Sequence, residues 1–395
     1  MRIFNSGGRR DPHVLHRLSL GPRFLWFTNS TTRHIFKLME ELVFATIVGL
    51  RFIVPLFIPR FPIPAILTAL VLDAVDQTIF AFFKVEPPNY QSYDKALDIY
   101  YLAIAYISTI RNWVNNTAFV GGQSLWYFRL VGVLLFELTG WRTILFLFPN
   151  VFEYFFIWYE AIRLRWKSVR LSRRHIISAI AFIWIVVKLP QEYWIHIAQL
   201  DFTDFMAANP WAWGVIAVAA AVVGYIVCRI WPTLPGADWS FSFNADKHIE
   251  KGVNMSITAF TKYPLLEKTV LVGLVTAIFL QLLPDTQARV IDVVAGAGAI
   301  IFISSFVGSW LSSRGRSWAG SGVSFVGTFA INVAVVWVLE LLSFDILENA
   351  SIGLSLFLLT LLTLIVTLYD RFRDIRIARS QHHRAHTKKN EILLN

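Results

Sequence analysis

The chain has 395 residues, of which 56% are hydrophobic and 16% are charged, and its formal net charge is +10. Soluble proteins carry about 25% charged residues, so this composition excludes a soluble enzyme, a nucleic-acid-binding protein and a disordered scaffold. The single cysteine, Cys228, excludes a disulfide framework and any multi-cysteine metal or iron–sulfur site.

Apolar segments follow one another along most of the chain. A helix needs about 20 mostly apolar residues to cross the hydrocarbon core of a bilayer. Eleven segments qualify: 41–58, 63–84, 95–114, 121–139, 143–163, 176–198, 211–231, 268–284, 289–311, 319–342 and 351–369. The sequence therefore predicts an all-α, polytopic integral membrane protein with 10–11 transmembrane helices.

Polar and basic stretches divide these segments into five parts. Residues 1–40 form a basic, amphipathic arm that we expect to lie on the membrane surface. We expect an N-terminal helical bundle over 41–231 and a C-terminal bundle over 267–369, joined by a polar loop at 232–266. Residues 370–395 form a basic tail.

Basic residues in short loops indicate the orientation of the chain. Lysine and arginine are concentrated in the loop 163–174 and in the tail after residue 370, and such segments stay in the cytoplasm. We therefore expect a cell-membrane protein with a cytoplasmic C-terminal tail. Five predicted spans separate the basic N-terminal arm from the basic loop, so the two lie on opposite sides unless one predicted span does not cross.

Ionisable residues inside membrane spans are costly and mark functional sites by default. Asp73 and Asp76 are three residues apart, and Asp94 and Asp98 are four apart, so each pair shares one face of its helix. Because a short loop joins the two helices, the four carboxylates can converge. Such a group must be protonated, paired with a cation such as Arg51, or bound to a divalent metal ion. In one interpretation, the group is a buried ion-pair network that only stabilises the bundle.

The aspartates follow the pattern D-x2-D-x17-D-x3-D within 73-DAVDQTIFAFFKVEPPNYQSYDKALD-98. This spacing resembles that of the CDP-alcohol phosphotransferases, whose signature is D-x2-D-G-x2-A-R-x8-G-x3-D-x3-D. The stretch 50-LRFIVPLFI-58 also resembles the first span of that family. The family's Gly, Ala, Arg and second Gly are replaced here by Gln77, Phe80, Ala81 and Tyr90. Because the bulky Phe80 and Tyr90 would fill the space for the nucleotide, the resemblance favours a divergent relative with a different substrate.

The resemblance implies a role for each matching residue. Asp73, Asp76 and Asp94 would bind a divalent metal, Mg²⁺ or Mn²⁺, and Asp98 would act as the general base on an acceptor hydroxyl. Arg51 or Arg111 would hold a phosphate or a phospholipid headgroup.

Two other classes of function remain open. A proton- or ion-coupled transporter or channel would use the other ionisable residues of the first bundle, namely Glu137, Glu153, Glu160, Glu192 and His196. A non-catalytic scaffold or a subunit of a membrane complex needs no such site. Membrane lipids are the expected partners in every case, nucleic acid in none, and a homo-oligomer or a larger membrane complex is compatible with the composition.

Overall fold

The protein is described here by a computed structural model that covers residues 30–83, 85, 89–200, 202–248, 264–283, 318–341 and 352–394. The basic arm before residue 30 and the predicted span 289–311 lie outside the described residues. Within those ranges every regular element is a helix. The α-helices are α1 (Ser30–Ile53), α2 (Pro62–Phe83), α3 (Tyr90–Asn112), α4 (Asn116–Thr139), α5 (Arg142–Leu147), α6 (Val151–Arg163), α7 (Arg173–Phe182), α8 (Leu189–Glu192), α9 (Phe202–Ala208), α10 (Ala212–Ile230), α12 (Pro264–Gln281), α14 (Trp318–Leu341) and α15 (Ile352–Leu394).

Five helical segments of the described chain are long and apolar enough to cross a membrane. They are Pro62–Phe83, Asn116–Thr139, Arg173–Ile197, Ala212–Thr233 and Ile352–Ile377. This finding confirms the prediction of an all-α membrane protein. Among the described residues, α1 and α3 do not meet this criterion because they carry more charged residues along their length.

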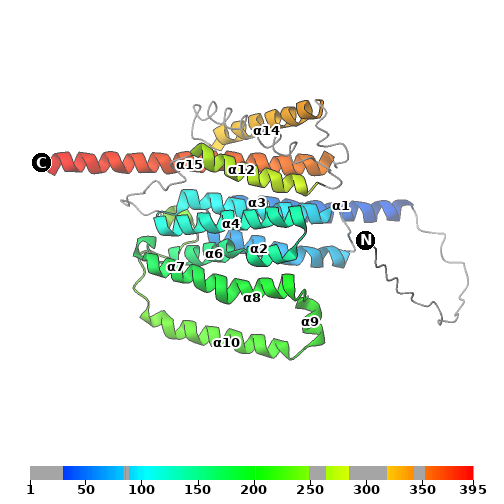
Figure 1. Cartoon of the computed structure of the whole chain (residues 1–395), viewed down its shortest axis with the longest axis horizontal. Coiled ribbons are helices and arrows are strands. Elements are labelled where there is room, and N and C mark those ends of the chain that lie inside the picture. The colour runs from blue at the N-terminus through cyan, green and yellow to red at the C-terminus, as the bar shows by residue number, and fades with distance from the viewer. Residues whose placement is uncertain are drawn as a thin grey trace, which may run out of the picture.

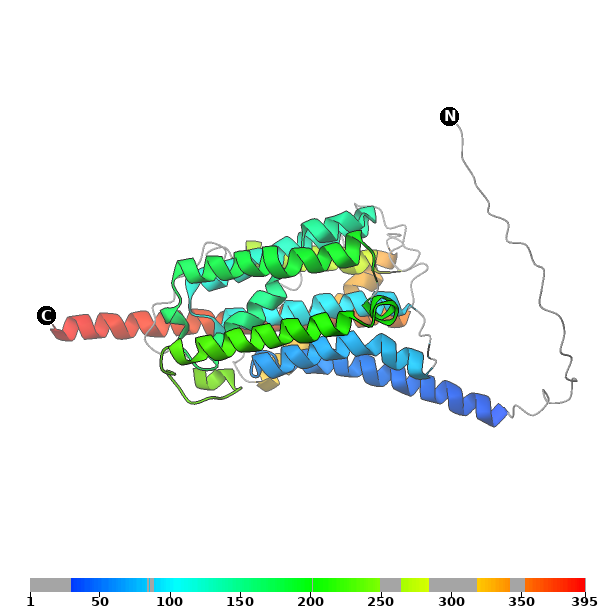
Figure 2. The same cartoon turned by 90° about the horizontal axis from the view of Figure 1, so that it is seen from below.

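The helices run roughly parallel to one another along the long axis of the molecule (Figures 1 and 2). Helix α3 is central, since almost every residue from Ala96 to Ile110 is buried. It packs against α1, α2, α4 and α15, while α12 packs against α4 and α15. One hydrophobic core therefore includes residues of both predicted bundles, for example Tyr106 of α3 and Ile365 of α15.

The predicted span 143–163 is not a single helix. It is divided into α5 and α6 by the segment Phe148–Asn150. Pro149 explains the break, because proline lacks a backbone N–H and its ring clashes inside a helix. With 13 residues, α6 is about 20 Å long, too short to cross the hydrocarbon core without α5.

Two π-helical turns, Ile183–Lys188 and Tyr193–Ile197, flank α8 and make one continuous helical segment with α7. Pro190 lies in α8 between them. Local π-turns are rare in helices and frequently accompany functional sites. Here they lie next to Lys188, Glu192 and His196.

Helix α10 lies outside the rest of the bundle (Figure 1). Apart from Ala212, its residues are exposed, including Val218, Val222 and Tyr225. An apolar helix with no buried face suits a position in lipid, since lipid tails are as apolar as the helix itself.

Successive helices alternate in direction. Helices α1, α2, α3, α4 and the α5–α6 pair each run the length of the bundle, so the start of α1 and the loop 163–174 lie at opposite ends (Figure 1). The end of α15 lies at the same end as the loop. We call this the basic end.

Candidate functional site

Three helices bring five charged side chains to one point. Arg51 comes from the last turn of α1, Asp73 and Asp76 from the middle of α2, and Asp94 and Asp98 from the first turns of α3. The i,i+3 and i,i+4 spacings place both members of each pair on the face toward Arg51. We call this group the Arg51 cluster.

The guanidinium group of Arg51 contacts all four carboxylates. Its Nη2 atom donates to Asp73 at 2.5 Å and to Asp98 at 2.7 Å. Its Nη1 atom donates to Asp94 at 2.5 Å and also to Asp76. Arg51 and Asp76 are 4% and 1% exposed, whereas the Asp98 side chain is 41% exposed. The cluster therefore has a buried side at Asp76 and an accessible side at Asp98.

The charges of the Arg51 cluster do not balance. With four ionised carboxylates and one guanidinium, the cluster has three more negative charges than positive ones. Desolvation and mutual repulsion oppose that state unless protons or a further cation compensate it. Asp73, Asp76 and Asp94 each offer an oxygen atom, and these three oxygens lie within 4.8 Å of one another. The donor set suits a hard cation that prefers oxygen ligands.

Two of the residues that depart from the phosphotransferase signature lie beside the cluster. Phe80 is 4% exposed and meets Tyr90 edge to face, with 4.9 Å between ring centroids. Both pack with Ile47 and Val85 in a small apolar cluster. The Tyr90 hydroxyl is buried next to Asp76. The space that small residues would leave open here is filled by aromatic rings.

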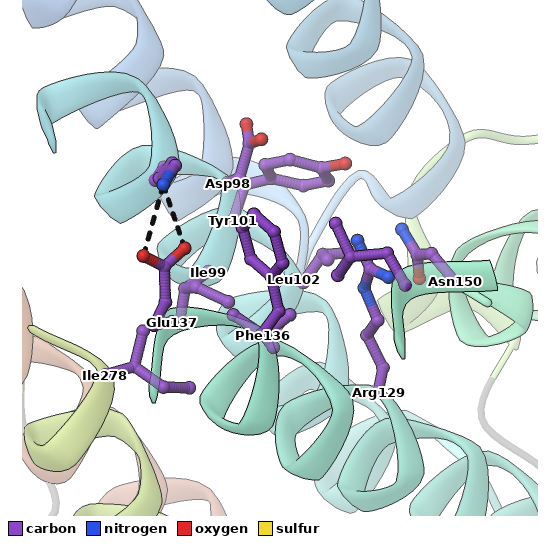
Figure 3. Close-up of a pocket in the computed structure, with 12 residues that line it drawn as sticks. Asp98, Ile99, Tyr101, Leu102, Arg129, Phe136, Glu137, Asn150 and Ile278 are labelled. Carbon is purple, nitrogen blue, oxygen red and sulfur yellow. Dashed lines mark hydrogen bonds and ion pairs between the residues drawn. The ribbon is translucent and has the colours of Figure 1, made fainter. Parts of the chain in front are cut away.

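A cavity of about 140 Å³ adjoins the accessible side of the cluster (Figure 3). Asp98 and Tyr101 of α3 form one part of its wall, and Arg129 of α4 and Asn150 form another. Lys95 also lines it and holds Glu137 through both carboxylate oxygens, at 2.9 and 3.1 Å. We call it the Asp98 cavity.

A chain of hydrogen bonds continues from the wall of the Asp98 cavity into α6 and α8. Tyr101 donates to Glu153 at 3.1 Å, and the side chain of Asn150 donates to the same carboxylate at 2.6 Å. The backbone N–H of Asn150 donates to Glu192 at 3.3 Å. Glu192 in turn pairs with Lys188 at 3.2 Å and with His196 at 3.1 Å.

The structure does not bring Arg111 to the Arg51 cluster. Arg111 lies 13 residues beyond Asp98 on α3, which is about 20 Å along the helix axis. It donates to the carbonyl of Pro59 at 2.5 Å and pairs with Asp246 at the basic end. The expectation that Arg111 holds a phosphate beside the aspartates is thus not supported by its position.

Glu160 is also separate from the other acidic residues of the first bundle. It accepts a hydrogen bond from the indole of Trp113 at 2.7 Å and two from Arg163 at 2.8 Å. All three side chains are buried. Because these partners satisfy Glu160 near the basic end, it has no connection to the chain that leads from Tyr101 to His196.

Four residues at the Asp98 cavity were not among the sequence candidates: Lys95, Tyr101, Arg129 and Asn150. Lys95 and Arg129 carry a usable signal, because each is a cation within an otherwise apolar segment. Tyr101 and Asn150 carry no such signal in the sequence, because tyrosine and asparagine are common near the ends of spans.

Asp73, Asp76 and Asp94 present carboxylate oxygens that lie close enough together for one metal ion to contact all three, and Asp98 presents a partly exposed carboxylate. Comparison with known proteins adds no relative to this picture: no protein-family model, no curated protein and no solved structure matches the chain.

Proposed function

We propose that this integral membrane protein binds a divalent cation at the Arg51 cluster and acts on a phosphate-bearing lipid headgroup, as a divergent relative of the CDP-alcohol phosphotransferases. The observation that carries the proposal is the charge imbalance of the cluster, in which four carboxylates share one guanidinium. A divalent cation supplies two of the three missing positive charges without protonating the carboxylates.

The residues of the cluster fit a metal ion such as Mg²⁺ or Mn²⁺. Asp73, Asp76 and Asp94 would hold it through carboxylate oxygens that already lie within 4.8 Å of one another. A bound divalent ion would supply Lewis-acid stabilisation of charge on phosphate oxygens. Asp98, on the accessible side, is available to accept a proton from a hydroxyl group, and Arg51 orients all four carboxylates.

The packing of Phe80 against Tyr90 supports a substrate other than a CDP-activated alcohol. These rings occupy the positions where the family has small residues next to its nucleotide. A headgroup donor without a nucleotide needs no such space. The protein would therefore use the metal ion and the general base of the family but a different headgroup donor.

Metal binding by the purified protein tests the proposal. We expect Mn²⁺ to bind the full chain in nanodiscs with a stoichiometry of one, detected by electron paramagnetic resonance, and Asp76→Asn to abolish the bound signal. Glu41→Gln is the matched control, because Glu41 lies on α1 with a 66% exposed side chain and pairs only weakly with Lys37 at 3.9 Å. Equal binding by all three proteins, or none by the wild type, would refute a metal site and favour the purely structural ion-pair network.

The chain of hydrogen bonds from Tyr101 to His196 favours a second candidate function, proton-coupled transport. Asn150 donates to both Glu153 and Glu192 and so holds these two carboxylates near each other, and Glu192 contacts His196. Carboxylates and histidines in such series are typical of proton relays in membranes. Transport predicts proton flux into liposomes that Glu192→Gln abolishes and Glu41→Gln leaves unchanged. Flux that persists in Glu192→Gln would exclude this route.

We place the protein in the cell membrane with the basic end in the cytoplasm. The loop 163–174 and the end of α15 share this end of the bundle, and both are rich in arginine and lysine. The Asp98 cavity adjoins the first turns of α3 and the last turns of α4. It consequently faces the opposite, external half of the bilayer.

A further inference from the structure

The segment that follows α10 is fastened to the basic end of the bundle, and we call residues 235–248 the strap. Asp238 of the strap accepts a hydrogen bond from the backbone N–H of Lys167 at 2.8 Å and pairs with Arg170 at 2.5 Å. Both partners belong to the loop 163–174. The strap therefore lies against the basic loop.

The strap also holds the ends of α2 and α3. The backbone N–H of Ala245 donates to the carbonyl of Arg60, which precedes α2, at 2.8 Å. Asp246 accepts a hydrogen bond from Arg111 in the last turn of α3. Since α2 and α3 carry the four aspartates of the Arg51 cluster, the strap restrains the opposite ends of the helices that build this site.

His248, the last residue of the strap, is buried against α6. Its ring centroid lies 5.0 Å from that of Trp239, whose indole donates to the carbonyl of Arg163 at 3.0 Å. His248 is 3% exposed, and its Nε2 atom is buried without a hydrogen-bond partner among the described residues. A proton on this nitrogen would place a charged N–H group in the interior without an acceptor, which is costly.

Two cations act on the ring of His248, one from α6 and one from the strap itself. They are Arg163 and Lys247. Both oppose a further positive charge, as does the removal of the ring from water. A backbone hydrogen bond with Ser240 has the opposite effect but is outweighed, so that burial, Arg163 and Lys247 lower the pKa of His248.

The carboxylates at this end are engaged by other cations. Glu160 accepts two hydrogen bonds from Arg163 at 2.8 Å, and Asp246 pairs with Arg111. Within the described ranges, no salt bridge joins a carboxylate to His248. A protonated imidazole would consequently find neither an acceptor nor a counter-charge in its present position.

From these contacts we infer that the strap is a pH-sensitive regulatory element, which stays fastened while His248 is neutral and leaves the bundle when this ring gains a proton. Moving the strap into water gives the new N–H group an acceptor and separates its charge from Arg163. Release frees the ends of α2 and α3 that the strap holds through Ala245 and Asp246. In the proposed orientation the strap faces the cytoplasm, so acidification of the cytoplasm would release it.

The size of the effect follows from the proton affinity of the two states. In the released strap, His248 has the ordinary histidine pKa of about 6.5, whereas the fastened strap binds the proton more weakly. The fastened state is therefore favoured above this pH and loses its advantage below it. Between pH 7.5 and 5.5, linkage shifts the equilibrium towards release by up to about 10-fold.

Cysteine labelling of the full chain in nanodiscs measures this release in a Cys228→Ser background. Ala245→Cys places a thiol in the strap where the native residue is 3% exposed, and Trp141→Cys, at a position that is 72% exposed, corrects for the pH dependence of the reaction. We expect the ratio of the two labelling rates to rise by up to about 10-fold from pH 7.5 to 5.5. Ala103→Cys, at a fully buried position of α3, should stay unlabelled because the release is local.

His248→Gln should abolish the rise in this ratio, because glutamine gains no proton. His175→Gln is the matched control, since His175 is exposed in the first turn of α7 at the same end and should leave the rise unchanged. His248→Lys carries its charge at both pH values, so it should label rapidly even at pH 7.5, and it serves if His248→Gln does not fold. A ratio that does not change with pH, a rise that persists in His248→Gln, slow labelling of His248→Lys at pH 7.5, or an equal rise for Ala103→Cys would overturn the inference.

Discussion

Replacing Arg51 with methionine removes the one guanidinium group that four carboxylates share. Arg51 and Asp76 are 4% and 1% exposed, so their pair is fully buried. Removing one partner of a buried pair costs about 3–5 kcal/mol, because the other charge is left uncompensated. We therefore expect Arg51→Met to lower the free energy of unfolding by about 3–5 kcal/mol.

Reversible unfolding in mixed micelles, followed by tryptophan fluorescence, measures this free energy. Arg60→Met is the matched control, because the Arg60 side chain is 64% exposed and lies 3.9 Å from Asp246; it should cost less than about 1 kcal/mol. The double variant Arg51→Met/Asp76→Asn should recover part of the lost free energy of unfolding, because it removes the buried carboxylate that Arg51→Met leaves without a cation. A loss below 1 kcal/mol for Arg51→Met, or strictly additive losses in the double variant, would refute this account of the cluster.

The same variant distinguishes a metal site from a structural ion-pair network. Without the guanidinium, the four carboxylates have no cation at all among the described residues. If the cluster binds Mn²⁺, adding the ion at 100 times its dissociation constant should restore about 2.7 kcal/mol. A structural network predicts no restoration.

Two further predictions concern packing and pH. In Gly132→Ala, the new Cβ would overlap Cβ of Phe148, and we expect a loss of about 1–3 kcal/mol in the same unfolding assay. Gly224→Ala has nothing within 4 Å of the new Cβ and should stabilise the helix by about 0.5–1 kcal/mol. His248 lies in the loop at the basic end and is 3% exposed, and burial lowers the pKa of its imidazole. Since the unfolded chain then binds more protons than the folded one, stability should fall as the pH drops below the ordinary histidine pKa of about 6.5. His248→Gln should flatten this dependence between pH 7 and 5; an unchanged slope would assign it to another group.

The convergence of the aspartates is the part of the site that helix geometry alone predicts. Spacings of three and four residues fix the faces of α2 and α3, and the short connection between the helices keeps them adjacent. The same geometry argues against Arg111, because 13 residues of helix separate it from Asp98. A helix of this length, at a rise of about 1.5 Å per residue, places Arg111 too far along α3 to reach the cluster.

Contacts between distant segments could not be predicted in this way. Tyr106 of α3 and Gln123 of α4 both donate to the buried carboxylate of Glu267 on α12. Lys268 on the same helix pairs with Asp370 of α15 at 2.7 Å. No local pattern relates residues more than a hundred positions apart, since packing decides which helices meet.

The alternation of helices also decides which side of the membrane the Asp98 cavity faces, and this can be measured with a cysteine at each end. Cys228 is the chain's single cysteine, so Cys228→Ser provides a cysteine-free background. Val169→Cys introduces a thiol into the basic loop at a position that is 48% exposed, and Trp141→Cys introduces one beyond the end of α4 at a position that is 72% exposed.

In sealed, right-side-out vesicles, we expect a membrane-impermeant maleimide to label Trp141→Cys and to label Val169→Cys only after permeabilisation, because segments rich in arginine and lysine are usually retained in the cytoplasm. The reverse pattern would place the Asp98 cavity on the cytoplasmic side and would show that the basic arm before residue 30, not the loop, sets the topology. Labelling of both from one side would contradict the alternation of α4, α5 and α6 itself.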